Sequence, residues 1–154
     1  MMMTLIVIAV VSGALLLGAV WGIYGSLSEK TEGFLVALAG GALIVSAVLE
    51  LINPAMEKSS IGIALSIVFA GALVFTGLDY LVKQKWGSNS GGGLLAAITL
   101  DGIPENLALG VALIGADPLS IAALSGSIFL SNLPEAAGGA KEMTQNGASK
   151  KKVL

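Results

Sequence analysis

The sequence carries one rare pattern twice, as Asp101-Gly-Ile-Pro-Glu105 (DGIPE) and as Ser131-Asn-Leu-Pro-Glu135 (SNLPE), 30 residues apart. Both copies lie inside stretches that are otherwise apolar enough to cross a membrane as helices. A charged side chain at the centre of a bilayer costs about 2.5 to 3.5 kcal/mol, so carboxylates at this depth indicate a function. The two patterns therefore decide how the rest of the sequence is interpreted.

The composition is that of a helical membrane protein. Of the 154 residues, 55% are hydrophobic and only 12% are charged. The net charge is -2, and the lysines are scattered, which argues against nucleic acid as a partner. The chain has no cysteine and no histidine, which excludes thiol catalysis, disulfides, Cys/His zinc sites and imidazole bases. Only oxygen ligands remain for a metal site.

Five apolar stretches have the length of about 20 residues that a membrane-spanning helix needs. We therefore predict an all-α fold, in which residues 1–154 form a single transmembrane domain. Short polar turns are predicted at 26–32, 54–59 and 115–118, and a longer polar loop at 83–91, so that neighbouring helices run antiparallel. The predicted spans are Thr4–Tyr24, Gly33–Asn53, Ser60–Val82, Gly92–Ile114 and Leu119–Ala140.

The lysines predict an orientation, because short loops rich in lysine face the cytoplasm. Lys58 stands alone on one side of the predicted bundle. Seven lysines lie on the other side: Lys30, Lys83, Lys85, Lys141, Lys150, Lys151 and Lys152. We expect the N-terminus outside, the C-terminus in the cytoplasm, and the protein in the plasma membrane or the bacterial inner membrane.

The two polar patterns are predicted to meet near the middle of the bilayer. Asp101 lies about 13 Å from the start of its helix and Ser131 about 18 Å from the start of its own. Since these helices are antiparallel neighbours, the two depths nearly coincide in a core of about 30 Å. Each pattern also places two polar residues on one helix face at a spacing of four. The candidate metal ligands are Asp101, Glu105, Ser131, Asn132 and Glu135.

Pro104 and Pro134 are predicted to kink these two helices, since each removes an N–H and frees the carbonyl four residues earlier. Broken helices with free carbonyls bind ions in many transporters, so a divalent cation fits the pattern. The alternative is a pair of kinks with protonated acids that are hydrogen-bonded between helices.

Two weaker polar groups have plainer interpretations. Glu50, Asn53 and Glu57 are spaced to share one face at the outer end of their helix, as a vestibule or as solvated residues at a helix end. Asp79 has Lys83 four residues later and is predicted to pair with it.

With these patterns the chain resembles the ZIP family of divalent metal transporters, whose fourth helix usually carries His-Asn-x-Pro-Glu-Gly and whose fifth carries a related polar pattern. DGIPENLALGVAL at 101–113 is similar to the family's fourth helix, and ALAGGALIVSAVLELINPAME at 37–57 to its second. The resemblance implies that Asp101, Glu105, Ser131, Asn132 and Glu135 occupy metal-coordinating positions. It also implies zinc, although an oxygen-only set suits Mg, Mn or Ca better, and Fe also accepts carboxylates.

The chain departs from the family pattern in ligands and in length. Asp101 replaces the usual histidine, Gly102 the asparagine and Asn106 the glycine, so a second metal position in the site is in doubt. ZIP proteins have eight helices, and this sequence ends where a loop between helices 5 and 6 is expected. We therefore expect a fragment of a longer protein, or a chain that completes itself as a homo-oligomer.

Three classes of function are compatible with these features. The first is a ZIP-like carrier, not an enzyme, that moves a divalent cation (Zn, Mn, Fe or Mg) inward between helices 4 and 5. The second is a non-transporting fragment or degenerate homologue that binds or assembles in the bilayer. The third, least favoured, is an intramembrane hydrolase with two carboxylates sharing a proton.

Overall fold

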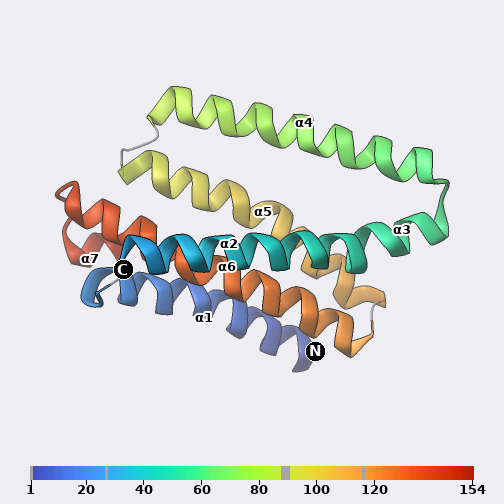
Figure 1. The fold of residues 1–154 in the computed structure, drawn as a ribbon, viewed down its shortest axis with the longest axis horizontal. Helices are drawn as coiled ribbons and strands as arrows, with labels where there is room; N and C mark the ends of the chain where they lie inside the picture. Colours follow the sequence, from blue (N-terminus) through green and yellow to red (C-terminus); the bar gives the residue numbers. More distant parts are fainter. Residues whose placement is uncertain (1, 27, 88–90, 116) are drawn as a thin grey trace.

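The computed structural model of the chain is an all-helical bundle (Figure 1). It describes residues 2–26, 28–87, 91–115 and 117–154, with only the backbone of 91, 92 and 94. In chain order, the elements are α1 (Met2–Tyr24), α2 (Glu29–Ser46), the π-helical segment η1 (Ala47–Ile52), α3 (Asn53–Lys58), α4 (Ile61–Trp86), α5 (Gly91–Gly115), α6 (Pro118–Gln145) and α7 (Lys150–Val153).

Several helices begin and end at residues with a local physical reason. Ser28, Ser60 and Asp117 precede α2, α4 and α6, and each side-chain oxygen accepts a hydrogen bond from a backbone N–H in the first turn. Gly87 ends α4 with a φ of 75°, a conformation that favours glycine. Polar caps and a glycine therefore delimit helices whose interiors are almost entirely apolar.

The predicted turn at residues 54–59 is wrong, because α2, η1 and α3 form one continuous helix, Glu29–Lys58. Pro54 would disrupt an ordinary α-helix, since it has no N–H and its ring clashes with the carbonyl four residues earlier. Here the turn before Pro54 widens to a π-helix over Ala47–Ile52, which accommodates the proline. The chain reverses only at Ser59 and Ser60.

Other helices also extend beyond the predicted spans. α2 begins at Glu29 instead of Gly33, α4 continues past Val82 to Trp86, and α6 continues past Ala140 to Gln145. These extra turns are polar, and hydropathy alone places the end of a helix where the apolar run stops. Leu27, residues 88–90 and Ala116, which belong to predicted turns and loops, lie outside the described residues.

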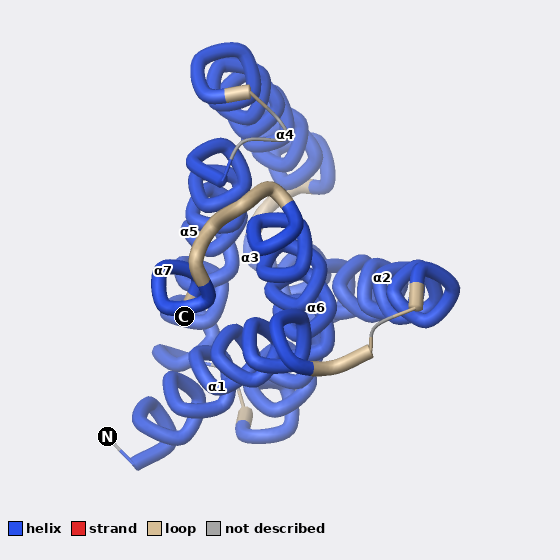
Figure 2. The backbone as a smooth tube through the Cα atoms, turned by 90° about the vertical axis from the view of Figure 1, so that its left-hand side faces the viewer, coloured by secondary structure: helices blue, strands red, loops and turns tan. Residues whose placement is uncertain are grey.

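α6 lies at the centre of the bundle, in contact with α1, α2 and α5, whereas α4 packs mainly against α5 at the edge (Figures 1 and 2). α1 runs parallel to α6, and α2 and α5 run antiparallel to it (Figure 1). Side chains of α1, α5 and α6 form the apolar core: Val7, Val11, Leu109, Ala112, Ile121, Leu124 and Ile128. α6 is thus the helix that the others surround.

Four helices in the described part of the chain are long and apolar enough to cross a membrane. They are α1, the continuous helix Glu29–Lys58, α4, and the Leu95–Gly115 part of α5. α6 has the length, with 28 residues, but it carries more polar side chains than the other four. The structure therefore has four candidate spans where the sequence predicts five.

Candidate metal centre between α5 and α6

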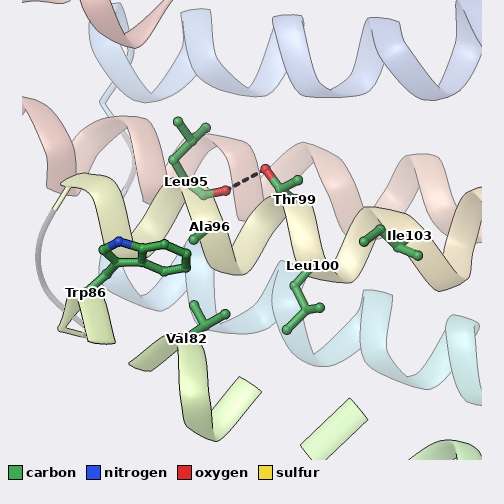
Figure 3. A pocket seen from close by; sticks show the side chains of 7 residues that line it. All are labelled: Val82, Trp86, Leu95, Ala96, Thr99, Leu100 and Ile103. Carbon is green, nitrogen blue, oxygen red and sulfur yellow. Dashed lines mark hydrogen bonds between the residues drawn. The ribbon is translucent and has the colours of Figure 1, made fainter. Parts of the chain in front are cut away.

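α5 has two chemically different faces. One face packs against α4 and, with Val82 and Trp86 of α4, lines an open apolar pocket of about 400 Å³ (Figure 3). Its lining residues on α5 are Leu95, Ala96, Thr99, Leu100 and Ile103. The one hydroxyl among them, on Thr99, donates a hydrogen bond of 2.8 Å to the Leu95 carbonyl, so it is satisfied within the helix. The other face carries the acids and meets α6.

The acids of α5 and α6 meet because the two helices pack antiparallel. The Ile98 side chain lies beside Gly139, 3.1 Å from where a Cβ would stand there. One turn further along α5, the side chains of Asp101 and Glu135 of α6 are hydrogen-bonded to each other. The structure therefore brings together two of the five predicted ligands, one from each pattern.

Glu105 belongs to the same region. It is half-buried and interacts electrostatically with both Asp101 and Glu135. The antiparallel register places Glu105 level with Ser131, which is also half-buried, while the Asn132 side chain is buried at 5% exposure. Asp101, Glu105 and Glu135 therefore form one acidic region of the α5–α6 contact, called the α5–α6 layer below, and Ser131 and Asn132 lie one turn away on α6.

No acid of this layer forms an ion pair with a lysine of the described residues, although Lys83 attracts Asp101 electrostatically. The two ion pairs of the described residues are Lys83 with Asp79, at 2.7 Å, and Lys141 with Glu32, at 3.3 Å. The first confirms the predicted pairing of Asp79. Neither pair includes an acid of the α5–α6 layer, so this layer carries negative charge whenever its carboxyl groups lose their protons.

The acids do not form a complete metal cage. Within the described ranges, no three acidic side chains stand close enough together to hold a metal ion. The arrangement is a carboxyl pair, Asp101 and Glu135, with Glu105 further away. Hydroxyl and amide oxygens of Ser131 and Asn132 are the other protein donors at this level, and hard cations accept such oxygens.

The predicted stripe of Glu50, Asn53 and Glu57 is divided by the π-helix. Glu50 lies in η1 and lines a cavity of about 420 Å³, which Lys58 and Asp117 also border. Asn53 and Glu57 are exposed and do not line this cavity. The wider turn therefore changes the face on which Glu50 lies, and only Glu50 remains a candidate for a vestibule.

Sequence patterns did not identify two further features. Glu32 and Lys141 are ion-paired although they lie 109 residues apart, and no local spacing signals such a pair. The second feature is the contact of α1 with α6 at Gly18 and Gly22, where the main chains of the two helices pack directly against each other. The spacing of four between these glycines is a recognised helix-packing signal, and it was available in the sequence.

Comparisons with protein families, with curated proteins and with solved structures found no match for this chain. A function for the chain is therefore argued from the geometry of the α5–α6 layer and from the sequence patterns.

Proposed function

We propose that this chain is an integral membrane protein with five spans, of which α6 is the fifth. α6 is long enough, at 28 residues, and its polar residues Ser125, Ser127 and Asn132 are buried among other helices, with Glu135 half-buried. Polar groups inside a membrane bundle are tolerated in such positions. The lysine distribution supports an N-terminus outside and a C-terminus in the cytoplasm.

The proposed activity is inward transport of a divalent cation through the α5–α6 layer. The observation that carries this proposal is the pair of Asp101 and Glu135 on facing helices, with Glu105 nearby and no lysine paired to them in the described part of the chain. Carboxylates at this depth are costly, and a bound cation offsets the cost. The sequence resemblance to ZIP transporters supports the same assignment.

In this mechanism the cation binds between Asp101 and Glu135, and the proton of their hydrogen bond is released to water. Two carboxylates remove most of the cation's charge, and Glu105, Ser131 and Asn132 supply further oxygens as the ion passes through this region. Pro104 and Pro134 lie inside the two helices and leave the Leu100 and Leu130 carbonyls without the usual N–H partner. Alternating exposure of this layer to the two membrane faces completes transport, with no covalent step.

A second function, cation binding without transport, has one specific observation in its favour. The described acids do not form a three-carboxylate group, and the histidines of transporting ZIP proteins are missing. Such a protein would bind a divalent cation at Asp101 and Glu135 and would assemble with other helices in the bilayer.

Uptake into proteoliposomes tests the proposal. The chain is reconstituted and offered Zn²⁺, Mn²⁺, Fe²⁺, Co²⁺ and Mg²⁺ separately. We expect uptake of at least one cation and a loss of about tenfold or more in Glu105→Gln and Glu135→Gln, since each removes a ligand charge. Glu57→Gln is the matched control, because Glu57 is exposed and is not among the groups that act on the acids of the layer. Equal uptake by all the variants contradicts transport through this site, and binding without uptake selects the second function.

A further inference from the structure

α1 and α6 approach so closely that two positions on α1 have no room for a Cβ unless the helices shift. A Cβ added at Gly18 would stand 2.9 Å from the Ala136 Cβ, and it would also collide with the Leu133 carbonyl oxygen. A Cβ at Gly22 would collide with main-chain atoms of Ala137. Carbon atoms pack best at about 3.5 to 4.0 Å, so a methyl group at Gly18 moves the helices apart by about 1 Å.

The constraint is local to these two glycines. Gly13 lies on the same helix, and a Cβ there meets nothing within 4 Å. A Cβ at Gly22 would clash with the main chain of Ala137, and a Cβ at Gly18 would clash most closely with the Leu133 carbonyl oxygen. Because these are main-chain atoms, shortening a neighbouring side chain cannot remove the clashes.

The part of α6 that α1 contacts is the part that carries Glu135. Residues two positions apart on a helix point about 200° apart, so Glu135 faces almost opposite to Leu133 and Ala137. Ala136, the other contact of Gly18, lies about 100° from Glu135, so α1 supports α6 mostly from the side away from Glu135. A push from α1 therefore moves this part of α6 toward α5.

α6 is also confined on its other sides. Gly139 lies against the Ile98 side chain of α5, and a Cβ at Gly138 would stand 2.6 Å from the carboxylate of Glu32 on α2. Close-packed helices transmit a displacement instead of absorbing it. A shift of α6 away from α1 therefore changes the separation of Asp101 and Glu135.

We propose that Gly18 and Gly22 are positioning residues for the candidate metal centre, setting the Asp101–Glu135 separation through the α1–α6 contact. The inference rests on the proposed function, since it gives these glycines their role in cation binding. Metal affinity is sensitive to the residues that orient ligands, whose loss typically weakens binding about 10- to 100-fold.

The first measurement is Mn²⁺ affinity of the purified chain in detergent. We expect Gly18→Ala and Gly22→Ala to bind about tenfold more weakly than the wild type while keeping its helical circular dichroism. Gly13→Ala should bind as the wild type does, because its methyl group enters open space. Wild-type affinity in both Gly18→Ala and Gly22→Ala overturns the inference.

The second measurement does not depend on cation binding. The chain has no cysteine, so Asp101→Cys with Glu135→Cys forms a single reporter pair, whose oxidation protects both thiols from a maleimide-polymer label. We expect Gly18→Ala to change the rate of disulfide formation by about fivefold or more, because this bond is sensitive to separation and direction, and Gly13→Ala to leave it unchanged. An unchanged rate in Gly18→Ala overturns the inference. If the wild type binds no Mn²⁺ but the rate still changes, the positioning role stands and the cation function fails.

If neither Gly18→Ala nor Gly22→Ala folds, a third variant can test the same contact. Ala136→Gly removes one methyl group from the same contact and adds no atom. We expect it to alter both the Mn²⁺ affinity and the disulfide rate, and wild-type values for both would overturn the inference.

Discussion

α4 and α6 are helices of similar length, 26 and 28 residues, with opposite environments. α4 buries only Ala64 among its described residues and exposes large apolar side chains such as Phe69 and Leu73. α6 buries eleven residues, and six of them are alanine, glycine or serine. Hydropathy identifies α4 as a span and passes over α6. An apolar helix therefore lies at the edge of this bundle, whereas the central helix is built largely from small and polar residues, as at helix–helix contacts inside membranes.

The largest stability difference between the two helices is expected for isoleucine truncation. Ile128 of α6 is 1% exposed and Ile67 of α4 is 67% exposed. Ile128→Ala leaves a cavity in the α1–α5–α6 core and should cost about 3 kcal/mol. Ile67→Ala removes only contacts with lipid or detergent and should cost less than about 0.5 kcal/mol. Reversible unfolding in mixed micelles measures both, and equal losses would contradict the central position of α6.

Enlarging a small residue should give the next largest difference. Ala137 of α6 is completely buried, whereas Ala70 of α4 is exposed. Ala137→Leu overpacks the contact with Gly22 and should cost about 2 kcal/mol. Ala70→Leu is the matched control and should have almost no effect. Thermal denaturation followed by circular dichroism compares the two, and tolerance of leucine at position 137 would contradict a main-chain contact between α1 and α6.

A buried hydrogen bond sharpens the comparison at a smaller scale. Ser46, the last residue of α2, and Ser127 of α6 are joined by a buried bond of 2.5 Å. Ser66 of α4 instead donates to its own helix, to the Gly62 carbonyl at 2.7 Å. Ser46→Ala should cost about 0.6 kcal/mol, the mean for interhelical bonds in a membrane, and Ser66→Ala less. A double-mutant cycle with Ser127→Ala isolates the interaction, and a coupling of zero would contradict the bond.

The smallest effect concerns the caps at which the two helices begin. Ser60 caps α4 and does not titrate, but Asp117 caps α6. Hydrogen bonds from the Ser120 hydroxyl and from the backbone N–H groups of Ser120 and Leu119 lower the pKa of Asp117 below its ordinary value of 3.8. Because the folded pKa is the lower one, the stabilisation is complete above the unfolded pKa and is lost as the pH falls through the folded pKa.

The apparent Tm of the wild type should therefore fall slightly more between pH 5 and pH 2 than that of Asp117→Asn, which caps the helix without titrating. Other carboxyl groups titrate equally in both proteins, so the difference reports Asp117. Identical pH profiles would remove Asp117 as a titrating cap.

The sequence predicts the helices and the pairing of acids across two of them, because hydropathy and the spacing of Asp101 and Glu105 are local signals. It misplaces the reversal at Pro54, because proline usually ends a helix and the π-helical turn depends on how the whole segment packs. The pairing of Glu32 with Lys141 was not predictable, since only the fold brings α2 and α6 together. Five spans, orientation and transport remain predictions.

Binding of Mn²⁺ to the purified chain, measured by electron paramagnetic resonance of the free ion, tests the metal centre most directly. The account predicts that the wild type and Glu57→Gln bind Mn²⁺ equally, and that Asp101→Asn with Glu135→Gln weakens binding about tenfold or more. The same affinity in the double variant, or no binding by a folded wild-type chain, would contradict a metal centre at Asp101 and Glu135.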